Sequence, residues 1–244
     1  MKILGIIPSR MGSKRLPGKP LIPINGKPMI RRVYEQAVQS KLLARVVVAT
    51  DDHRIADEIT HIGGNVLMTS STHRNGTERC GEVLQTYPEY DYVVNIQGDE
   101  PYVHPDQIDL LCDTLDGNVE LATLAKKITQ EATLHDPSKI KVTFDRTGKA
   151  LYFSRTCIPY LRDHNSNLLA HHDFYKHIGL YAYRSDILPK INQLPPGKLE
   201  QAESLEQLRW MENGYSIQVG ITTLDSQMVD TMADVAHLEN IYSK

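Results

Sequence analysis

The stretch "ILGIIPSRMGSKRLPGKP", residues 3–20, joins a short apolar run to a loop rich in cations. The run Ile3–Pro8 predicts a buried strand, because it is short, continuous and apolar and is followed by turn-forming residues. A basic loop at the end of a strand can bind phosphate, remain a solvated surface feature, or bind nucleic acid. The rest of the chain decides among these roles. The four cations of the loop are Arg10, Lys14, Arg15 and Lys19.

The composition of the whole chain argues against two classes of partner. The 244 residues include 27 basic and 30 acidic side chains, for a net charge of -3. Binding to nucleic acid or to an anionic membrane normally needs a basic surplus or a long basic face. We therefore expect no nucleic-acid partner and no membrane partner, and the basic loop is a local concentration of charge.

Cysteine usage and the N-terminus predict the compartment. The three cysteines are far apart and outside any CxxC spacing, which argues against a disulfide framework and a structural zinc site. The apolar N-terminal region "MKILGII" is too short for a signal peptide, and no run approaches the roughly 20 apolar residues of a membrane span. We expect a soluble, untargeted protein of the reducing cytoplasm.

Apolar runs and longer helical stretches alternate along the first half of the chain. This rhythm favours a layered α/β fold in which helices cover both faces of a sheet. The helices between the strands present apolar faces that include Met29, Ile55 and Ile108. The expected strands are Ile3–Pro8, Ala44–Thr50, Val66–Met68, Tyr92–Ile96, Leu121–Lys126 and Ile140–Phe144.

The second half of the chain is more antiparallel. Two strands are expected around a turn at Asp145–Lys149, and "HIGLYAYR" predicts a further strand. The segment Leu199–Gly214 predicts one strong helix that stops at its glycine. We expect a single domain, residues 1–244, that carries a smaller lobe formed by about residues 130–195.

The basic loop does not match the two familiar glycine-rich phosphate motifs. A P-loop needs four residues between its glycines and a Ser or Thr after the Lys, but here five residues separate Gly12 from Gly18 and Pro20 follows Lys19. The GxGxxG fingerprint is absent as well. The loop still offers cations and the backbone amides of Gly12 and Ser13 at the carboxyl end of the first strand, where ligands of α/β sheets bind. Phosphate binding is therefore favoured over a merely solvated loop.

A set of motifs extends this interpretation along the chain. In this order they resemble the motifs of the 3-deoxy-manno-octulosonate cytidylyltransferases, also called CMP-Kdo synthetases. The resemblance runs from residue 6 to about residue 231, which is nearly the whole chain. The motifs are "IPSRMGSKRLPGKPL", "INGKPMI", "VVATDD", "NGTER", "NIQGDEP", "LYFSR", "HIGLYAY" and "LEQLR".

The resemblance implies an activity, a fold and an assembly. The family transfers CMP from CTP to the anomeric hydroxyl of 3-deoxy-D-manno-octulosonate (Kdo), releasing pyrophosphate and giving CMP-Kdo for lipopolysaccharide biosynthesis. The implied fold is a mixed, mainly parallel sheet sandwiched by helices, of the nucleotide-diphospho-sugar transferase type, with a smaller antiparallel dimerisation lobe. We therefore expect a homodimer that binds CTP, Kdo and Mg²⁺.

Four residues carry the chemistry that the resemblance implies: Arg10, Lys19, Asp99 and Asp230. In-line attack on a triphosphate calls for cations and a divalent metal. Asp99 and Asp230 are the expected Mg²⁺ ligands, because this ion prefers carboxylate and phosphate oxygens. Asp230 can also help to deprotonate the attacking hydroxyl. Without the resemblance, Asp99 is equally well a turn residue and Asp230 the N-cap of the last helix.

The resemblance also implies a CTP-binding set. Arginine forks and lysine point charges would hold the phosphates. The segment "RNGTER" would lie near the base, where backbone groups and an Arg can recognise cytosine. Taken alone, that segment is an ordinary helix-entry turn, and the roles of Lys14 and Glu100 stay open. The set comprises Arg10, Ser13, Arg15, Lys19, Arg74, Asn75, Gly76, Thr77 and Gln97.

Five residues form the implied sugar-binding set: Arg155, His177, Tyr181, Glu206 and Gln207. Arg155 suits bidentate contact with the carboxylate of a sugar acid. His177 and Tyr181 lie four apart on an expected strand, so both project to one face. Glu206 and Gln207 offer an acceptor and an amide from one helix. The alternatives are a structural ion pair for Arg155, a satisfied core histidine for His177, core packing for Tyr181, and a solvated helix face for the last two.

Two rivals to the Kdo enzyme stay open at the level of sequence. The first is a cytidylyltransferase for another sugar acid, such as 8-amino-Kdo or a sialic acid. The second is a non-enzymatic module that binds nucleotides or polyanions through the basic loop alone and needs neither Asp99 nor Asp230.

Overall fold

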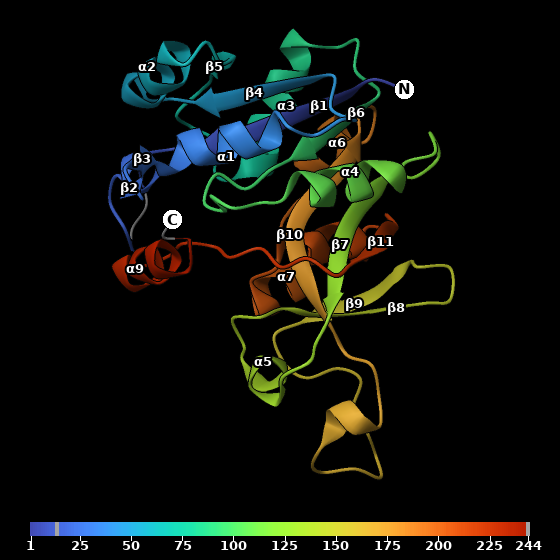
Figure 1. Ribbon diagram of the computed structural model, residues 1–244. Coiled ribbons are helices and arrows are strands. Elements are labelled where there is room, and N and C mark those ends of the chain that lie inside the picture. The colour runs from blue at the N-terminus through green and yellow to red at the C-terminus, as the bar shows by residue number, and fades with distance from the viewer. Residues whose placement is uncertain (13–14, 243–244) are drawn as a thin grey trace.

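A nine-stranded sheet organises the residues that the computed structural model describes, which are 1–12 and 15–242 (Figure 1). Along its main path the strands are β11 (Ile217–Thr222), β7 (Leu121–Lys127), β10 (Tyr175–Arg184), β6 (Tyr92–Asn95), β1 (Ile3–Ser9), β4 (Arg45–Thr50) and β5 (Val66–Met68). Strand β10 runs antiparallel to β6 and β7, and the other pairs on this path are parallel. The mixed, mainly parallel sheet expected from the sequence is therefore confirmed.

Both faces of the sheet are buried, which explains why its strands read as continuous apolar runs. In β1, Ile3 and Ile7 pack into one core and Leu4 and Ile6 into the other, because successive side chains of a strand point to opposite faces. The first core receives α1 (Met29–Ala37), α2 (His53–His61) and α4 (Pro105–Asp113). The second core receives α3 (Gly76–Thr86) and α6 (Leu188–Asn192).

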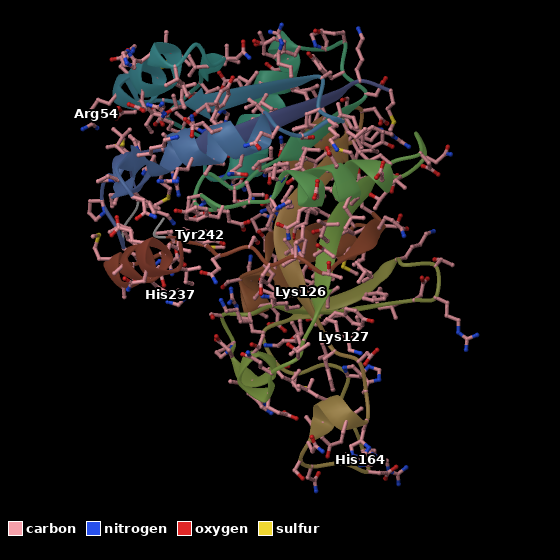
Figure 2. The ribbon with its side chains drawn as sticks, viewed as in Figure 1. Arg54, Lys126, Lys127, His164, His237 and Tyr242 are labelled. Atoms are coloured by element: carbon pink, nitrogen blue, oxygen red, sulfur yellow. The ribbon has the colours of Figure 1, made fainter. Side chains whose placement is uncertain are left out.

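A lobe extends from the sheet where β7 and β10 run past their neighbours (Figure 1). It contains α5 (Glu131–His135), β8 (Lys141–Phe144), β9 (Ala150–Ser154) and the short 3-10 helix η2 (Leu168–Ala170). Strands β8 and β9 form the predicted antiparallel pair, and β8 also pairs with the start of β10. In Figure 2, Lys126 and Lys127 mark the end of β7 where the lobe begins, and His164 lies at its far tip.

The single helix expected over Leu199–Gly214 is wrong. The segment forms α7 (Lys198–Glu203) and α8 (Glu206–Glu212), separated by Ser204 in the left-handed region at φ 52. Helix α7 buries none of its side chains, whereas α8 buries Leu208 and Trp210. One straight helix could not keep the first of these segments at the surface and bury the second in the core. The chain therefore breaks between α7 and α8. The break places Glu206 at the start of α8.

The end of the chain returns to its beginning. Helix α9 (Met232–Ile241) lies beside the short strands β2 (Pro23–Ile24) and β3 (Lys27–Pro28), which follow the 3-10 helix η1 (Lys19–Leu21) (Figure 1). A small core of Ile24, Met29, Val235 and Leu238 joins the two ends. Among the described residues, no helix has both the length and the apolar character needed to cross a membrane.

Candidate functional site

The first cavity opens at the carboxyl ends of β1 and β6, two neighbouring parallel strands, and measures about 550 Å³. The loop after β1 supplies its cations, and the turn Gln97–Asp99 after β6 supplies a carboxylate. The two loops approach closely at Gly98, where an added Cβ would lie 2.9 Å from the carbonyl oxygen of Pro8. Only glycine fits there without displacing the backbone, so the turn keeps Asp99 beside the basic loop.

Two carboxylates and two cations meet inside this cavity. The ammonium of Lys19 lies 2.6 Å from Asp99 Oδ2 and 3.3 Å from Asp230 Oδ1. Arg15 Nη2 lies 2.8 Å from the same oxygen of Asp230. Lys19 is 8% exposed, so its charge is largely removed from water and depends on these partners. The structure therefore brings together four of the residues that the sequence placed in the nucleotide site.

Asp230 does not cap the last helix, so the capping alternative for this residue is wrong. The N-cap of α9 is Thr231, whose hydroxyl accepts from the backbone N–H of Asp234. The side chain of Asp234 accepts from the backbone N–H of both Asp230 and Thr231. The backbone N–H of Val229 donates to the carbonyl of Asp99 at 2.9 Å. These bonds leave the carboxylate of Asp230 to face the cavity.

Most, but not all, of the predicted CTP-binding residues reach this cavity. Arg74 instead pairs with Glu78 at 2.6 Å, and Thr77 is buried with its hydroxyl donating to Glu206 Oε2 at 2.9 Å. Ser13, like Lys14, lies outside the described residues, so its assignment stays a prediction. The predicted residues that line the cavity are Arg10, Arg15, Lys19, Asn75, Gly76 and Gln97.

Three polar residues of this cavity were not assigned from the sequence: Ser9, His73 and Arg79. Arg79 is 3% exposed, bonds to Thr69 and lies 3.3 Å from Asp51. Burial lowers the pKa of its guanidinium from the usual value. Ser9 is buried, and its hydroxyl is one of the buried side-chain atoms without a partner among the described residues. The motif "NGTER" contains this Arg, so its place in a motif of the family was the available signal.

A second cavity of about 440 Å³ adjoins the first. Gln97 and Met228 line both cavities. Four of the five predicted sugar-binding residues line the second one: His177, Tyr181, Glu206 and Gln207. The two cavities thus place the predicted nucleotide and sugar sites side by side.

The aromatic pair His177 and Tyr181 lies on one face of β10, as predicted, but for a different reason. Their ring centroids are 5.2 Å apart, which is too close for residues four apart on a regular strand. The pairing of β10 with β7 shifts between Ile178 and Tyr181, so a bulge brings the rings together. Burial lowers the pKa of His177 to about 3 and raises that of Tyr181, so both rings are neutral.

Glu206 receives hydrogen bonds from the edge of the first cavity. Asn75 Nδ2 donates to its Oε1 and Thr77 Oγ1 to its Oε2, each at 2.9 Å. Burial raises the pKa of Glu206, and the hydroxyl of Thr77 opposes that shift. A carboxylate has about four acceptor positions, so Glu206 retains capacity for a ligand in the second cavity.

Arg155 does not line either cavity. Its guanidinium donates to three backbone carbonyls, those of Glu203 at 2.6 Å, Pro137 at 3.1 Å and Ser204 at 3.2 Å. In this arrangement it holds two segments of the second cavity's rim together. Its predicted contact with a sugar carboxylate stays a prediction.

The second cavity is also lined by charged groups that were not assigned from the sequence. Lys139 and Lys176 bring cations, and Lys176 Nζ lies 2.6 Å from Asp225 Oδ1. Glu100, whose role was left open, is 3% exposed. Burial and the neighbouring charge of Asp99 raise its pKa to about 7. The sequence around Lys139 and Lys176 does not identify them as site residues, because β10 and the segment before β8 come together only in the folded chain.

Comparisons with known proteins agree with this geometry. The family described as "Cytidylyltransferase" matches residues 4–218. A 3-deoxy-manno-octulosonate cytidylyltransferase of Cytophaga hutchinsonii is 50% identical, covering 100% of this chain and 98% of the relative. An 8-amino-3,8-dideoxy-manno-octulosonate cytidylyltransferase of Shewanella amazonensis is 44% identical, covering 98% of each. A solved structure of CMP:2-keto-3-deoxy-manno-octonic acid synthetase complexed with CTP superposes with a TM-score of 0.93 at 41% identity, covering 100% of this chain and 99% of the other.

Proposed function

This chain belongs to the 3-deoxy-manno-octulosonate cytidylyltransferase family, and from that premise we propose that it transfers CMP from CTP to the anomeric hydroxyl of Kdo. The products are CMP-Kdo and pyrophosphate. The observation that carries the proposal is the pair of adjoining cavities that share Gln97 and Met228. One cavity holds cations and carboxylates suited to a triphosphate, and the other holds hydrogen-bonding groups suited to a sugar acid.

Arg10, Arg15 and Lys19 bind the triphosphate. All three line the first cavity, and Lys19 is already held at a buried position by two carboxylates. Fixed cations stabilise the negative charge that develops on the phosphates during transfer without having to reorganise. The proximity of the two cavities orients the anomeric hydroxyl toward the α-phosphorus, which removes much of the entropic cost of a two-substrate reaction.

Asp99 and Asp230 fit the divalent cation that this family's chemistry requires. They are hard oxygen donors, and they already converge on one positive group, the ammonium of Lys19. When bound there, Mg²⁺ would supply neutralisation of phosphate charge. Asp230, which lines the first cavity two residues after the shared Met228, accepts the proton that the anomeric hydroxyl loses.

The second cavity binds the sugar through neutral and charged groups together. Glu206 and His177 offer acceptors to sugar hydroxyls, and Gln207 offers an amide. Lys139 and Lys176 offer the positive charge that the sugar carboxylate needs. Arg155 supports the rim through its three carbonyl contacts.

The wider setting follows from the same premise. The protein acts in the cytoplasm, supplies an activated sugar for lipopolysaccharide, and works as a homodimer through the lobe that contains β8 and β9 (Figure 1). Light scattering on the purified protein at several concentrations tests the dimer. A monomer at every concentration would contradict this part of the proposal.

The activity is tested with purified protein, CTP, Mg²⁺ and a panel of sugar acids, with pyrophosphate release as the readout. We expect release that depends on Kdo and on CTP, and little release with ATP, GTP or UTP. An absence of release with Kdo would contradict the proposal. Omission of the sugar and addition of a chelator are the controls.

A second candidate substrate is 8-amino-Kdo. Two carboxylates, Glu100 and Glu206, line the sugar cavity and could accept an ammonium as well as a hydroxyl. The Shewanella amazonensis relative carries that substrate in its name. The same panel compares the two sugars: a higher kcat/KM for 8-amino-Kdo than for Kdo would make it the preferred substrate.

A further inference from the structure

The bulge in β10 surrounds one buried hydroxyl. Ile178 pairs with Leu124 of β7, but Thr123, the next residue of β7, pairs with Tyr181. Gly179 and Leu180 are therefore extra residues on β10. Thr123 is fully buried, and its side chain lies against the bulge.

The hydroxyl of Thr123 has three polar neighbours. Its Oγ1 lies 2.9 Å from His177 Nε2, 3.1 Å from the carbonyl oxygen of Ile178 and 2.7 Å from that of Leu180. A hydroxyl carries one proton and two lone pairs, and a carbonyl can only accept. If the proton pointed to the imidazole, two carbonyl oxygens would face the hydroxyl oxygen with no proton between them. The proton must therefore point to a carbonyl, and His177 must donate to Thr123.

This arrangement determines which nitrogen of His177 carries the proton. Because Nε2 donates, and because burial lowers the pKa of the ring to about 3, Nδ1 is left with a free lone pair. In residues 1–12 and 15–242 the buried side-chain polar atoms without a partner are Ser9 Oγ, Asn95 Oδ1 and Trp210 Nε1. Nδ1 is not one of them and has no partner in this part of the chain, so it reaches the surface of the cavity that His177 lines.

The ring itself has little freedom to change this orientation. Phe153 meets it edge-to-face with centroids 5.2 Å apart, and Tyr181 lies at the same distance on a tilted plane. Aromatic packing of this kind restricts the imidazole to one position. The hydrogen bond to Thr123 then selects the tautomer, as the partner of one ring nitrogen does in general.

We infer that Thr123 is a positioning residue that fixes His177 as its Nε2–H tautomer, so that Nδ1 accepts a hydrogen bond from a hydroxyl of the sugar acid. The identity of the ligand rests on the proposed function, whereas the tautomer does not. The consequence is that this wall of the cavity selects for hydrogen-bond donors and discriminates against a sugar that lacks the hydroxyl.

The tautomer is measured by nitrogen NMR on protein labelled at its ten histidines, without substrate. The His177 signals are those missing from the spectrum of His177→Gln. We expect a protonated Nε2 and an unprotonated Nδ1 that do not change between about pH 6 and pH 8, since the ring's pKa lies far below. A protonated Nδ1 would overturn the inference, whether or not the protein proves to act on Kdo.

Kinetics with matched variants test the consequence for the sugar. Thr123→Val keeps the shape but removes the hydroxyl, and Thr123→Ser keeps the hydroxyl. We expect the Val variant to raise the KM for the sugar about tenfold with the KM for CTP unchanged, which corresponds to loss of one hydrogen bond. The Ser variant should stay near wild type. An unchanged sugar KM in a folded Val variant, or equal rises in both KM values, would overturn the inference.

A second pair of variants serves if Thr123→Val does not fold. His177→Asn places an amide oxygen near the position of Nδ1, whereas His177→Gln places an amide nitrogen near the position of Nε2. We expect the Asn variant to bind the sugar more tightly than the Gln variant, because only the first can replace the acceptor. The opposite order would contradict the role of Nδ1.

Discussion

The two cavities meet at Gln97 and Met228 but hold their polar groups in different ways. In the first, the groups are charged and follow directly after β1 and β6, with Lys19, Asp99 and Asp230 in mutual contact. In the second, His177 on β10 and Glu206 on α8 are partly buried and hydrogen-bonded to residues far along the chain, and the cations Lys139 and Lys176 line the same cavity. Contacts between opposite charges organise the first site, whereas directed hydrogen bonds hold the uncharged and acidic groups of the second.

The two sites should respond differently to substitution. A cluster of opposite charges can rearrange around a ligand, since Coulomb attraction acts over several ångströms and has little angular preference. A buried hydrogen bond has strict geometry, and a partner left unsatisfied there is costly. We therefore expect substitutions in the first cavity to act on the chemistry, and substitutions in the second to act on sugar binding and stability together.

The largest effect is expected for Asp99→Asn. The change removes one of two carboxylates that contact Lys19 and that we propose to hold the metal. Loss of a group that stabilises transition-state charge lowers kcat by about 10²–10³-fold. Pyrophosphate release measures this, with Asp57→Asn, an exposed residue of α2, as the control. Near-normal turnover would show that the charged cluster is not the reacting centre.

The next largest effect separates Arg10 from Arg74. Arg10 lines the first cavity, whereas the side chain of Arg74 is held by Glu78 outside it. Arg10→Ala should raise the KM for CTP about tenfold, as expected for loss of one charge-assisted hydrogen bond. Arg74→Ala should change it by less than about twofold, since an exposed ion pair contributes little. Equal effects of the two changes would contradict the placement of Arg74 outside the proposed nucleotide site.

A double-mutant cycle tests the contact between the cavities. Asn75 uses both ends of its amide: Oδ1 accepts from the backbone N–H of Glu78 and caps α3, and Nδ2 donates to Glu206. Asn75→Ser keeps a capping oxygen, and Glu206→Gln removes the charge. The coupling in kcat/KM for the sugar should be about 1 kcal/mol, roughly fivefold. Additive effects would mean that the two sites act independently.

The smallest effect is a loss of folding stability at mildly acidic pH, caused by protonation of His177 in the unfolded state. Burial lowers its pKa to about 3 in the folded protein, against an ordinary value of 6.5. The stability that depends on the neutral ring is fully present above about pH 6.5 and falls as pH is lowered toward the folded pKa, because the unfolded state binds the proton first. Urea unfolding at about pH 7.5 and pH 5.5 should show a loss on the order of 1 kcal/mol. The loss should be smaller in His177→Gln; an equal loss would assign it to other groups.

Much of the fold could be predicted because strand signals are local. The run Ile3–Pro8 is buried on both faces, so β1 was found within one residue. The short apolar run Val66–Met68 was found with its observed bounds, although it forms a partly exposed edge strand. The break at Ser204 could not be predicted, because the local pattern of Leu199–Gly214 continues through it. Only the need to bury α8 while α7 stays at the surface forces the chain to turn there.

The candidate site divides in the same way. The basic loop and the turn after β6 carry their chemistry in contiguous motifs, so Arg10, Lys19 and Asp99 could be named from the sequence. Lys176 and Thr123 could not, because each takes its role from a neighbour on another strand or segment. For Arg155 the motif was recognised but did not predict the contacts of the side chain. In the folded chain its guanidinium donates to backbone carbonyls.

The order of amino acids alone predicted the alternation of strands and helices, the basic loop at the end of the first strand, and the family. These depend on periodicity and on short motifs, which act over a few residues. Three features emerged only from the folded chain: Asp99 and Asp230 meet at Lys19, Asn75 donates to Glu206, and a bulge sets the proton on His177. Such contacts depend on the order of strands in the sheet and on the register between them, which no local preference encodes.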